Sequence, residues 1–238
     1  MNRKVFLSIT FFVLAIATGY AQQKNVNVLF VGNSLTYQNN LPELVKKIAA
    51  SDNVRLSYKM IALPNYALED HWNDGIVNTE IKSEKYNYVI VQQGPSSQPE
   101  GYKLLEEYGI KFSQLSNEHH AHLVFYMVWP AKTRLFDFPG VYKSYKNAAE
   151  QTQSIFSPAG QAWLTVWKTD PDFSLYDPDN FHPNDRGTLL AALVIYGSIS
   201  GKSDLRFIDL NSIKLANLSS KDFKLLTRAA EQTLTQEK

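Results

Sequence analysis

Nearly continuous apolar runs alternate with segments of helical spacing along most of this chain. Residues 26–31 are almost wholly apolar, as a strand must be when both of its faces are buried. Residues 41–50 carry apolar side chains at the three- and four-residue intervals of a helix that covers such a sheet. The same alternation predicts further strands at residues 56–63, 88–92, 123–128 and 154–158, and helices at 68–81, 102–116, 141–152, 188–199 and 221–234.

Strands that are separated by helices form a parallel sheet with helices on its faces. The pattern therefore predicts an α/β fold with five parallel strands. A turn-rich stretch, residues 169–185, contains two Asp-Pro pairs and precedes the helix expected at residues 188–199. No internal repeat, low-complexity tract or linker interrupts the chain after its first 21 residues, so residues 22–238 are expected to form a single domain.

The first 21 residues have the pattern of a secretory signal peptide. Asn2-Arg3-Lys4 precede a run from residue 5 to residue 16 that is almost wholly apolar. The segment ends at Gly19-Tyr20-Ala21, in which the first and third residues are small. This run is too short to span a bilayer comfortably. We expect cleavage after Ala21 and a periplasmic or secreted protein.

Composition narrows the possible partners. The chain contains no cysteine, which excludes disulfides, a thiol nucleophile and a lipid-modified cysteine as membrane anchor. The formal charge is +1, and loss of Arg3 and Lys4 with the signal peptide brings it to about −1. Near neutrality argues against nucleic acid as a partner, because such binding needs clustered basic side chains.

Two distant segments carry residues suited to nucleophilic catalysis. The strand at residues 26–31 ends at Gly32 and delivers Ser34 into the following turn, and Asp179 precedes His182 by three residues before an apolar helix. A carboxylate that orients a histidine creates a general base, and a serine beside that base becomes a nucleophile. Ligands bind at the carboxyl ends of parallel strands, where Ser34 is expected. Ser34, Asp179 and His182 are therefore a candidate triad, although Ser34 alone could also be a helix N-cap.

Other segments of the chain carry residue types that could serve a hydrolase or a metal site. The Gly-x-Ser-x-Gly elbow of an α/β-hydrolase is absent. His71 has Asp70 beside it and is a rival to His182 as the base, but its expected helical position favours packing or contact with substrate. His119, His120 and His122 form a histidine-rich cluster that could bind zinc. Their position at the amino end of a strand, opposite the expected catalytic edge, argues against this, and we expect no metal site.

The two catalytic segments resemble sequence blocks of the SGNH (GDSL-like) hydrolases. Gly32-Asn33-Ser34-Leu35 is similar to the first block, and Asp179-x-x-His182, followed by Pro183, Asn184 and Gly187, is similar to the last. The resemblance extends from about residue 26 to about residue 202. It implies a three-layer α/β/α sandwich of flavodoxin-like type and a serine hydrolase that acts on esters.

The resemblance also implies an oxyanion hole, in which the chain departs from the family pattern. The loop at residues 63–68 lacks the usual glycine, and Asn65 is the nearest substitute because asparagine tolerates a left-handed backbone. Ser96 stands where the family has an asparagine. Expected donors are the N–H groups of Ser34 and Asn65, with a side chain from Gln93 or Ser96. Alternation along the strand lets only one of Gln92 and Gln93 face the site, and both could instead satisfy loop backbone groups.

The substrate is less narrowly defined by the sequence. Trp129 follows a strand and is expected at the rim of the site, where it and His71 would contact substrate; burial in the core is the alternative for Trp129. An exported enzyme without a long apolar segment points to hydrolysis of acetyl esters on a carbohydrate, with no cofactor. Two alternatives stay open, namely an inactive glycan-binding protein on the same fold, and a lipid-directed esterase or thioesterase. The oligomeric state stays open as well.

Overall fold

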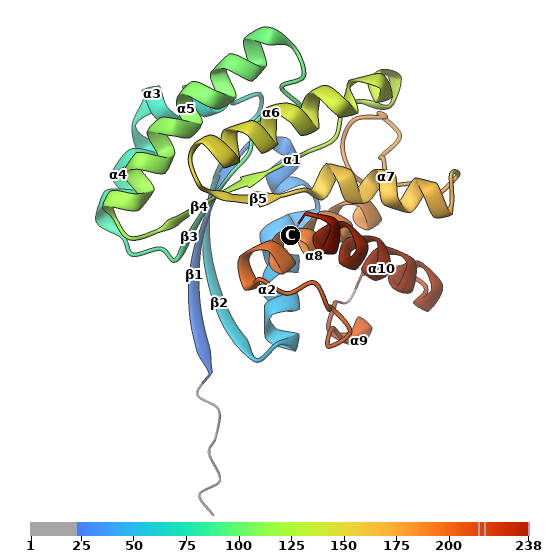
Figure 1. Cartoon of the computed structure of the whole chain (residues 1–238). Coiled ribbons are helices and arrows are strands. Elements are labelled where there is room, and N and C mark those ends of the chain that lie inside the picture. The colour runs from blue at the N-terminus through green and yellow to red at the C-terminus, as the bar shows by residue number, and fades with distance from the viewer. Residues whose placement is uncertain (1–22, 214, 217, 238) are drawn as a thin grey trace, which may run out of the picture.

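Five parallel strands form one sheet in the order β2-β1-β3-β4-β5 (Figure 1). The computed structural model describes residues 23–213, 215–216 and 218–237. The expected signal peptide, residues 1–21, lies outside the described residues. The strands are β1 (Lys24–Gly32), β2 (Val54–Ala62), β3 (Tyr88–Val91), β4 (His122–Tyr126) and β5 (Ile155–Ser157). The predicted α/β fold with a five-stranded parallel sheet is confirmed.

Helices cover both faces of the sheet, which makes three layers (Figure 1). One face carries α3 (Leu68–Asp74), α4 (Ile76–Ser83), α5 (Pro99–Glu118) and α6 (Phe138–Gln151). The other carries α2 (Leu41–Ser51), α7 (Ala159–Thr169), α8 (Asp185–Ser200) and α10 (Ser220–Gln236), with the short α9 (Leu210–Ile213) beside α2. Short helices α1 (Ser34–Tyr37), η1 (Gln38–Asn40) and η2 (Lys132–Asp137) lie in the connections.

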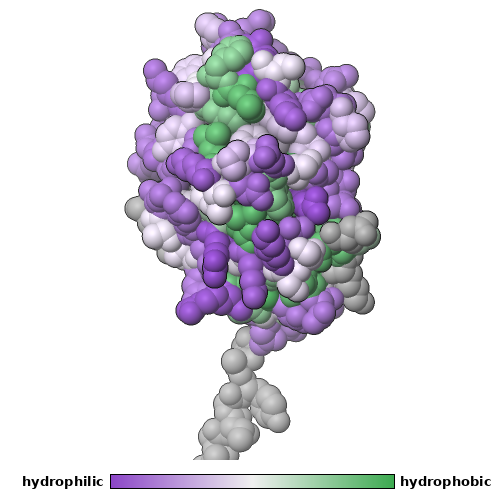
Figure 2. All heavy atoms as spheres, turned by 90° about the vertical axis from the view of Figure 1, so that its right-hand side faces the viewer, coloured by the Kyte–Doolittle hydropathy of each residue, from purple (hydrophilic) through white to green (hydrophobic). Residues whose placement is uncertain are grey.

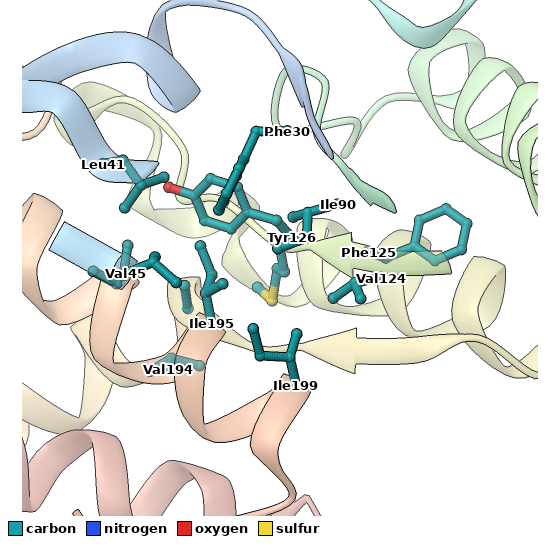
Figure 3. Close-up of a cluster of buried hydrophobic side chains, with 14 of the residues drawn as sticks. Phe30, Leu41, Val45, Ile90, Val124, Phe125, Tyr126, Val194, Ile195 and Ile199 are labelled. Carbon is teal, nitrogen blue, oxygen red and sulfur yellow. The ribbon is translucent and has the colours of Figure 1, made fainter. Parts of the chain in front are cut away.

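The apolar core lies on both faces of the sheet because the three central strands, β1, β3 and β4, bury both of their faces. Figure 3 shows Val124 and Tyr126 of β4 on the same side as Val45 of α2 and Ile195 of α8, while Phe125 points away from them. Phe125 reaches α5, where a Cβ on Gly109 would lie 2.7 Å from its ring. This alternation along β4 joins the two helical layers into one core.

Three sequence predictions need correction. The single helix expected at residues 68–81 is divided into α3 and α4, because Gly75 adopts a left-handed backbone (φ 73°) that ends α3. No helix was expected at Ala159–Thr169, yet α7 forms there, packed on α8 and α10. The strand expected at residues 123–128 ends at Tyr126, so Trp129 lies in the connection after β4.

None of the described helices combines the length and the apolar composition that crossing a bilayer requires.

Candidate active site

The turn between β1 and α1 presents Ser34 at the carboxyl edge of the sheet. Asn33 caps α1, since its side-chain oxygen accepts a hydrogen bond from the Leu35 N–H (3.1 Å), and Ser34 is the first residue of the helix. Gly32 has no room for a side chain, because a Cβ there would collide with Thr36 Oγ1 and Gln92 Oε1. The sharp turn therefore needs this glycine, and it leaves Ser34 half-buried.

Gln92 braces this turn from the end of β3. Its Oε1 accepts hydrogen bonds from the Asn33 N–H (3.1 Å) and the Thr36 hydroxyl (2.8 Å). Its Nε2 donates to Asn33 Oδ1 (3.1 Å) and to the Gln93 carbonyl (2.6 Å). Gln92 is fully buried, so water does not compete for these bonds. This turn, residues 32–36, which we call the nucleophile turn after the role predicted for Ser34, is thus fixed to the centre of the sheet.

Asp179 and His182 reach Ser34 from the loop before α8. His182 Nε2 lies 2.9 Å from Ser34 Oγ, and His182 Nδ1 lies 2.5 Å from Asp179 Oδ2. An ionised carboxylate only accepts, so Nδ1 carries the ring proton of the neutral histidine and Nε2 is left to accept from the serine hydroxyl. The structure therefore brings together the three predicted triad residues in the order required for proton transfer from Ser34.

The Asp179 carboxylate is surrounded by donors. Besides the His182 ring, the backbone N–H groups of Phe181 (3.0 Å) and His182 (2.9 Å) donate to its Oδ1. The hydrogen bond from the His182 ring, followed by the one from the Phe181 backbone, holds the pKa of the Asp179 carboxyl below its usual value. The carboxylate therefore stays ionised although half of the side chain is exposed.

Trp129 lies beneath residues 177–184, the segment that carries Asp179 and His182 and that we call the catalytic loop, and the prediction that Trp129 forms the rim of the site is wrong. The indole is fully buried because it stacks on Trp163 of α7, with ring centroids 3.7 Å apart. Its Nε1 donates to the Phe181 carbonyl (3.1 Å), one residue before His182. The Lys132 N–H donates to the Asn180 carbonyl (2.9 Å) in the same loop. Trp129 thus positions the loop and has no surface to offer to a substrate.

His71 is also buried, and its predicted contact with substrate is wrong. The side chain is 0% exposed, its Nε2 lies 2.8 Å from the Gly32 carbonyl, and the Tyr66 ring packs edge-on against it. Because a carbonyl only accepts, Nε2 carries the proton here. Nδ1 is buried and has no partner among the described residues. Burial lowers the pKa of His71, so the ring is held neutral as a packing group behind the nucleophile turn.

The expected oxyanion donors divide into two groups. In residues 23–213, 215–216 and 218–237, the backbone N–H groups of Ser34 and Asn65 make no hydrogen bond, and Asn65 has the left-handed backbone expected of it (φ 61°). The side-chain donors are already engaged. Gln93 Nε2 donates to Ser96 Oγ (2.7 Å) and the Gly101 carbonyl (3.0 Å), and the Ser96 hydroxyl donates to the Gly94 carbonyl (2.8 Å). The available donors at this edge are therefore backbone groups.

A cavity of about 430 Å³ adjoins the triad, and we call it the Ser96 cavity. Phe181, the residue before His182, and Ala67, which follows Tyr66, both line it. The Tyr66 carbonyl accepts a hydrogen bond from Asn33 Nδ2 (3.0 Å), which ties this wall to the nucleophile turn. The remaining lining comes from the segments after β3 and β4, including Ser96 and Arg134. The cavity thus reaches the sequence neighbours of the triad, while Ser34, Asp179 and His182 themselves are not among the residues that line it.

His122 begins β4, at the edge of the sheet opposite Ser34, as the sequence predicted. Among the described residues, no three His, Asp or Glu side chains are grouped as metal ligands.

Sequence reasoning did not identify the role of Gln92. Its signal lies in strand pairing: Val31 pairs with Val91, so Gln92 follows directly opposite Gly32, at the start of the nucleophile turn. Strand pairing gives no support for Gln93 as the side-chain donor of the oxyanion hole. The alternative interpretation, that both glutamines satisfy loop backbone groups, agrees with their contacts.

Comparison with known proteins relates this fold to ester hydrolases. No protein-family model and no curated protein sequence matches the chain. A DUF4886 family protein from Bacteroides uniformis has a similar structure, with a TM-score of 0.74 and 15% identity over 90% of this chain and 96% of that one. A protein from Slackia heliotrinireducens, assigned as an SGNH hydrolase, has a TM-score of 0.64 and 19% identity, covering 74% and 100% of the two chains.

A third similar structure is a variant of an acetyl-xylooligosaccharide esterase from Geobacillus, with a TM-score of 0.56 and 14% identity over 74% of this chain and 94% of that one. These identities are low, and what the comparisons establish is the fold. The chain has the three-layer fold of the SGNH hydrolases, as the resemblance in sequence implied.

Proposed function

We propose that this protein is an exported serine esterase that removes acetyl groups from a carbohydrate. The observation that carries the proposal is the continuous chain of contacts from Ser34 Oγ through His182 to Asp179, at 2.9 Å and 2.5 Å. Both distances are within the reach that proton transfer requires. The carboxyl edge of a parallel sheet is also where α/β folds bind their ligands.

In the proposed reaction, Ser34 Oγ attacks the ester carbonyl carbon while its proton passes to His182 Nε2. The tetrahedral intermediate collapses as the bond to the alcohol oxygen breaks, and His182 returns the proton to that oxygen. Water then attacks the acyl-serine, giving its proton to His182, and Ser34 leaves with that proton as the carboxylic acid is released. Asp179 stays ionised throughout and stabilises the imidazolium that forms twice in the cycle.

The negative oxygen of the intermediate is stabilised by the N–H groups of Ser34 and Asn65. Each is free to donate among the described residues. Losing one such donor typically lowers the rate by about 10² to 10³. An oxyanion hole made of two backbone donors predicts a slower esterase than one that also has a side-chain amide.

Three observations support acetyl groups and a carbohydrate. The Ser96 cavity opens beside Phe181, the residue before His182, and has room for a short acyl group. The Asp179 side chain is 50% exposed, so the site is open to a bulky hydrophilic substrate. A protein of the same fold is an acetyl-xylooligosaccharide esterase. Export rests on the signal-peptide pattern of residues 1–21.

Release of carboxylic acid from a panel of esters tests the proposal. The purified protein is given acetylated xylooligosaccharides, 4-nitrophenyl acetate and 4-nitrophenyl decanoate, with Ser34→Ala as the control for contaminating activity. We expect turnover of both acetyl substrates and little of the decanoate. Turnover of the decanoate alone would support a lipid-directed esterase, and no turnover by folded protein would support an inactive glycan-binding protein.

A further inference from the structure

A second cavity lies on the other side of the catalytic loop. It has a volume of about 720 Å³, and we call it the Trp167 cavity. Two segments separate it from the Ser96 cavity, residues 131–137 and residues 178–181, which together we call the ridge. Lys132, Leu135 and Asn180 line the Trp167 cavity, whereas Arg134, Asp137 and Phe181 line the Ser96 cavity. Neighbouring residues of the ridge thus face opposite cavities.

The ridge is held together by specific bonds. The Lys132 N–H donates to the Asn180 carbonyl (2.9 Å) and joins the two segments. Arg134 Nε donates to Asp137 Oδ2 (2.6 Å), and this bond keeps the pKa of Asp137 below its usual value. The Tyr176 hydroxyl donates to the Pro130 carbonyl (2.6 Å) at the base of the ridge. A ligand that spans both cavities would therefore meet a preformed surface.

Phe136 stands on this ridge with its ring in solvent. Its side chain is 75% exposed, more than any other large apolar residue in the described part of the chain, and the adjacent Leu135 is 42% exposed. The Arg134 guanidinium lies 5.6 Å from the ring centroid. Figure 2, which shows the side of the molecule that carries α7 and α10, has small separate apolar patches in a mainly hydrophilic surface. Leu135 and Phe136 together place an exposed apolar surface on the ridge between the two cavities.

The lining of the Trp167 cavity suits an uncharged, hydroxyl-rich ligand. Trp167 and Phe173 contribute aromatic rings, and Asp172, Asp177 and Asn180 contribute oxygen acceptors. The lining carries one lysine, Lys132, and two carboxylates, so it has no excess of positive charge that would favour an anionic ligand. Faces of sugar rings carry C–H groups that pack on aromatic rings, while their hydroxyls donate to carboxylates and amides.

We propose that Phe136 and the Trp167 cavity form a subsite for an uncharged oligosaccharide, which holds sugar units remote from the ester positioned at Ser34. The oligosaccharide crosses the ridge over Phe136, so that its acetyl group enters the Ser96 cavity and the neighbouring sugars occupy the Trp167 cavity. This inference rests on the proposed function, since it assigns the substrate of the same site. It makes Phe136 a determinant of specificity for polymeric substrates.

Binding without catalysis tests the subsite directly. Titration calorimetry on Ser34→Ala measures the affinity for unacetylated xylohexaose and chitohexaose, and then repeats the measurement in the Ser34→Ala/Phe136→Ala double variant. We expect at least one sugar to bind to Ser34→Ala, and loss of the ring to weaken that binding about tenfold, as for truncation of a contact that contributes strongly. Ile76→Ala is the matched control. Ile76 is also an exposed apolar residue (54%), and it lies on α4, far from the segment before α6 that carries Phe136 (Figure 1).

Kinetics separate failure of the subsite from failure of the proposed function. For Phe136→Ala, kcat/KM for acetylated xylooligosaccharide should fall about tenfold more than kcat/KM for 4-nitrophenyl acetate. Equal changes on the two substrates, or no binding of either sugar to Ser34→Ala, would overturn the subsite and leave the esterase standing. A dimer of the wild type that Phe136→Ala converts to monomer, seen by sedimentation velocity with no change in sugar affinity, would identify Phe136 as a self-association contact and also overturn it.

Discussion

At the scale of single residues, the orientation of His182 depends on one carboxylate. Asp179 Oδ2 holds His182 Nδ1 at 2.5 Å, and Asp179 Oδ1 fixes the loop by accepting from two backbone N–H groups. The same side chain therefore sets the position of the ring and its tautomer.

Asp179→Asn should preserve the conformation of the catalytic loop but change the tautomer of His182. The amide oxygen can still accept from the backbone, but the amide nitrogen would face Nδ1 and favour a proton on Nε2, which then cannot accept from Ser34. We expect kcat on 4-nitrophenyl acetate to fall by about 10³ to 10⁴ with a small change in KM. Asp185→Asn, an exposed carboxylate in the first turn of α8, is the control. Retention of more than about a tenth of kcat would assign the orienting role to another group.

His71 makes stability depend on pH. Because burial lowers its pKa in the folded state, the unfolded state takes up the proton first as the pH falls below about 6.5. The free energy of unfolding should therefore fall with pH in that window, by at most about 1.4 kcal/mol per pH unit from this group. His71→Gln retains a donor for the Gly32 carbonyl and removes the titration. Urea unfolding at about pH 7.5 and about pH 5.5 should show a smaller pH effect in the variant; equal pH effects would contradict the assignment.

At the scale of elements, the nucleophile turn between β1 and α1 is held by β3. Gln92 makes three hydrogen bonds to this turn, two of them with Asn33, the residue before Ser34, and a fourth to the Gln93 carbonyl. Because the strands of the sheet are rigidly paired, this side chain transfers the rigidity of the sheet to Ser34.

Gln92→Met keeps the length of the side chain and removes these bonds. Leaving buried donors unpaired should lower the free energy of unfolding by about 1 to 3 kcal/mol. Displacement of Ser34 should lower kcat on 4-nitrophenyl acetate by about 10². Urea unfolding and steady-state kinetics measure the two effects separately. Gln151→Met, at the exposed end of α6, is the matched control. A destabilised variant with unchanged kcat would show that Gln92 supports the fold but does not position Ser34.

At the scale of the whole molecule, one core connects the sheet, both helical layers and the catalytic loop. The buried Trp129–Trp163 stack lies under that loop and belongs to the same core as β1 and α8. We therefore expect a single cooperative unfolding transition. Tryptophan fluorescence of a Trp72→Phe variant, which reports Trp129, Trp163 and the neighbouring Trp167, and far-UV circular dichroism, which reports the helices, should give the same urea midpoint. An earlier fluorescence midpoint would mean that the catalytic edge unfolds separately.

The sequence predicted what depends on local pattern and missed what depends on packing between distant segments. Strands β1, β3 and β4 could be predicted because central parallel strands bury both faces and leave apolar runs. The contacts among Ser34, Asp179 and His182 could be predicted because Ser34 follows a strand, and because Asp179 and His182 are close in sequence. Helix α7 was missed although Ala162, Trp163 and Val166 have helical spacing.

The predictions that Trp129 and His71 contact substrate were wrong for a related reason. An aromatic residue after a strand can lie at the rim or beneath the loop, and the partner that decides, Trp163 stacked on Trp129, lies 34 positions further along the chain. Likewise, only strand pairing shows that Gln92 faces Gly32. The hydrogen bonds of Gln93 and Ser96 depend on how closely α5 approaches the loop after β3. A Cβ added to Gly101 of α5 would lie 3.1 Å from Ser96 Cα.

The proposed function depends on Ser34 being a nucleophile activated by His182, and covalent labelling detects such a nucleophile. The purified protein is treated with a fluorophosphonate, and the modified residue is located by peptide mass spectrometry in the wild type, Ser34→Ala and His182→Ala. We predict an adduct on Ser34 in the wild type, none in Ser34→Ala, and much slower labelling of Ser34 in His182→Ala. A folded wild-type protein that acquires no adduct, or that carries it on another residue, would contradict the account.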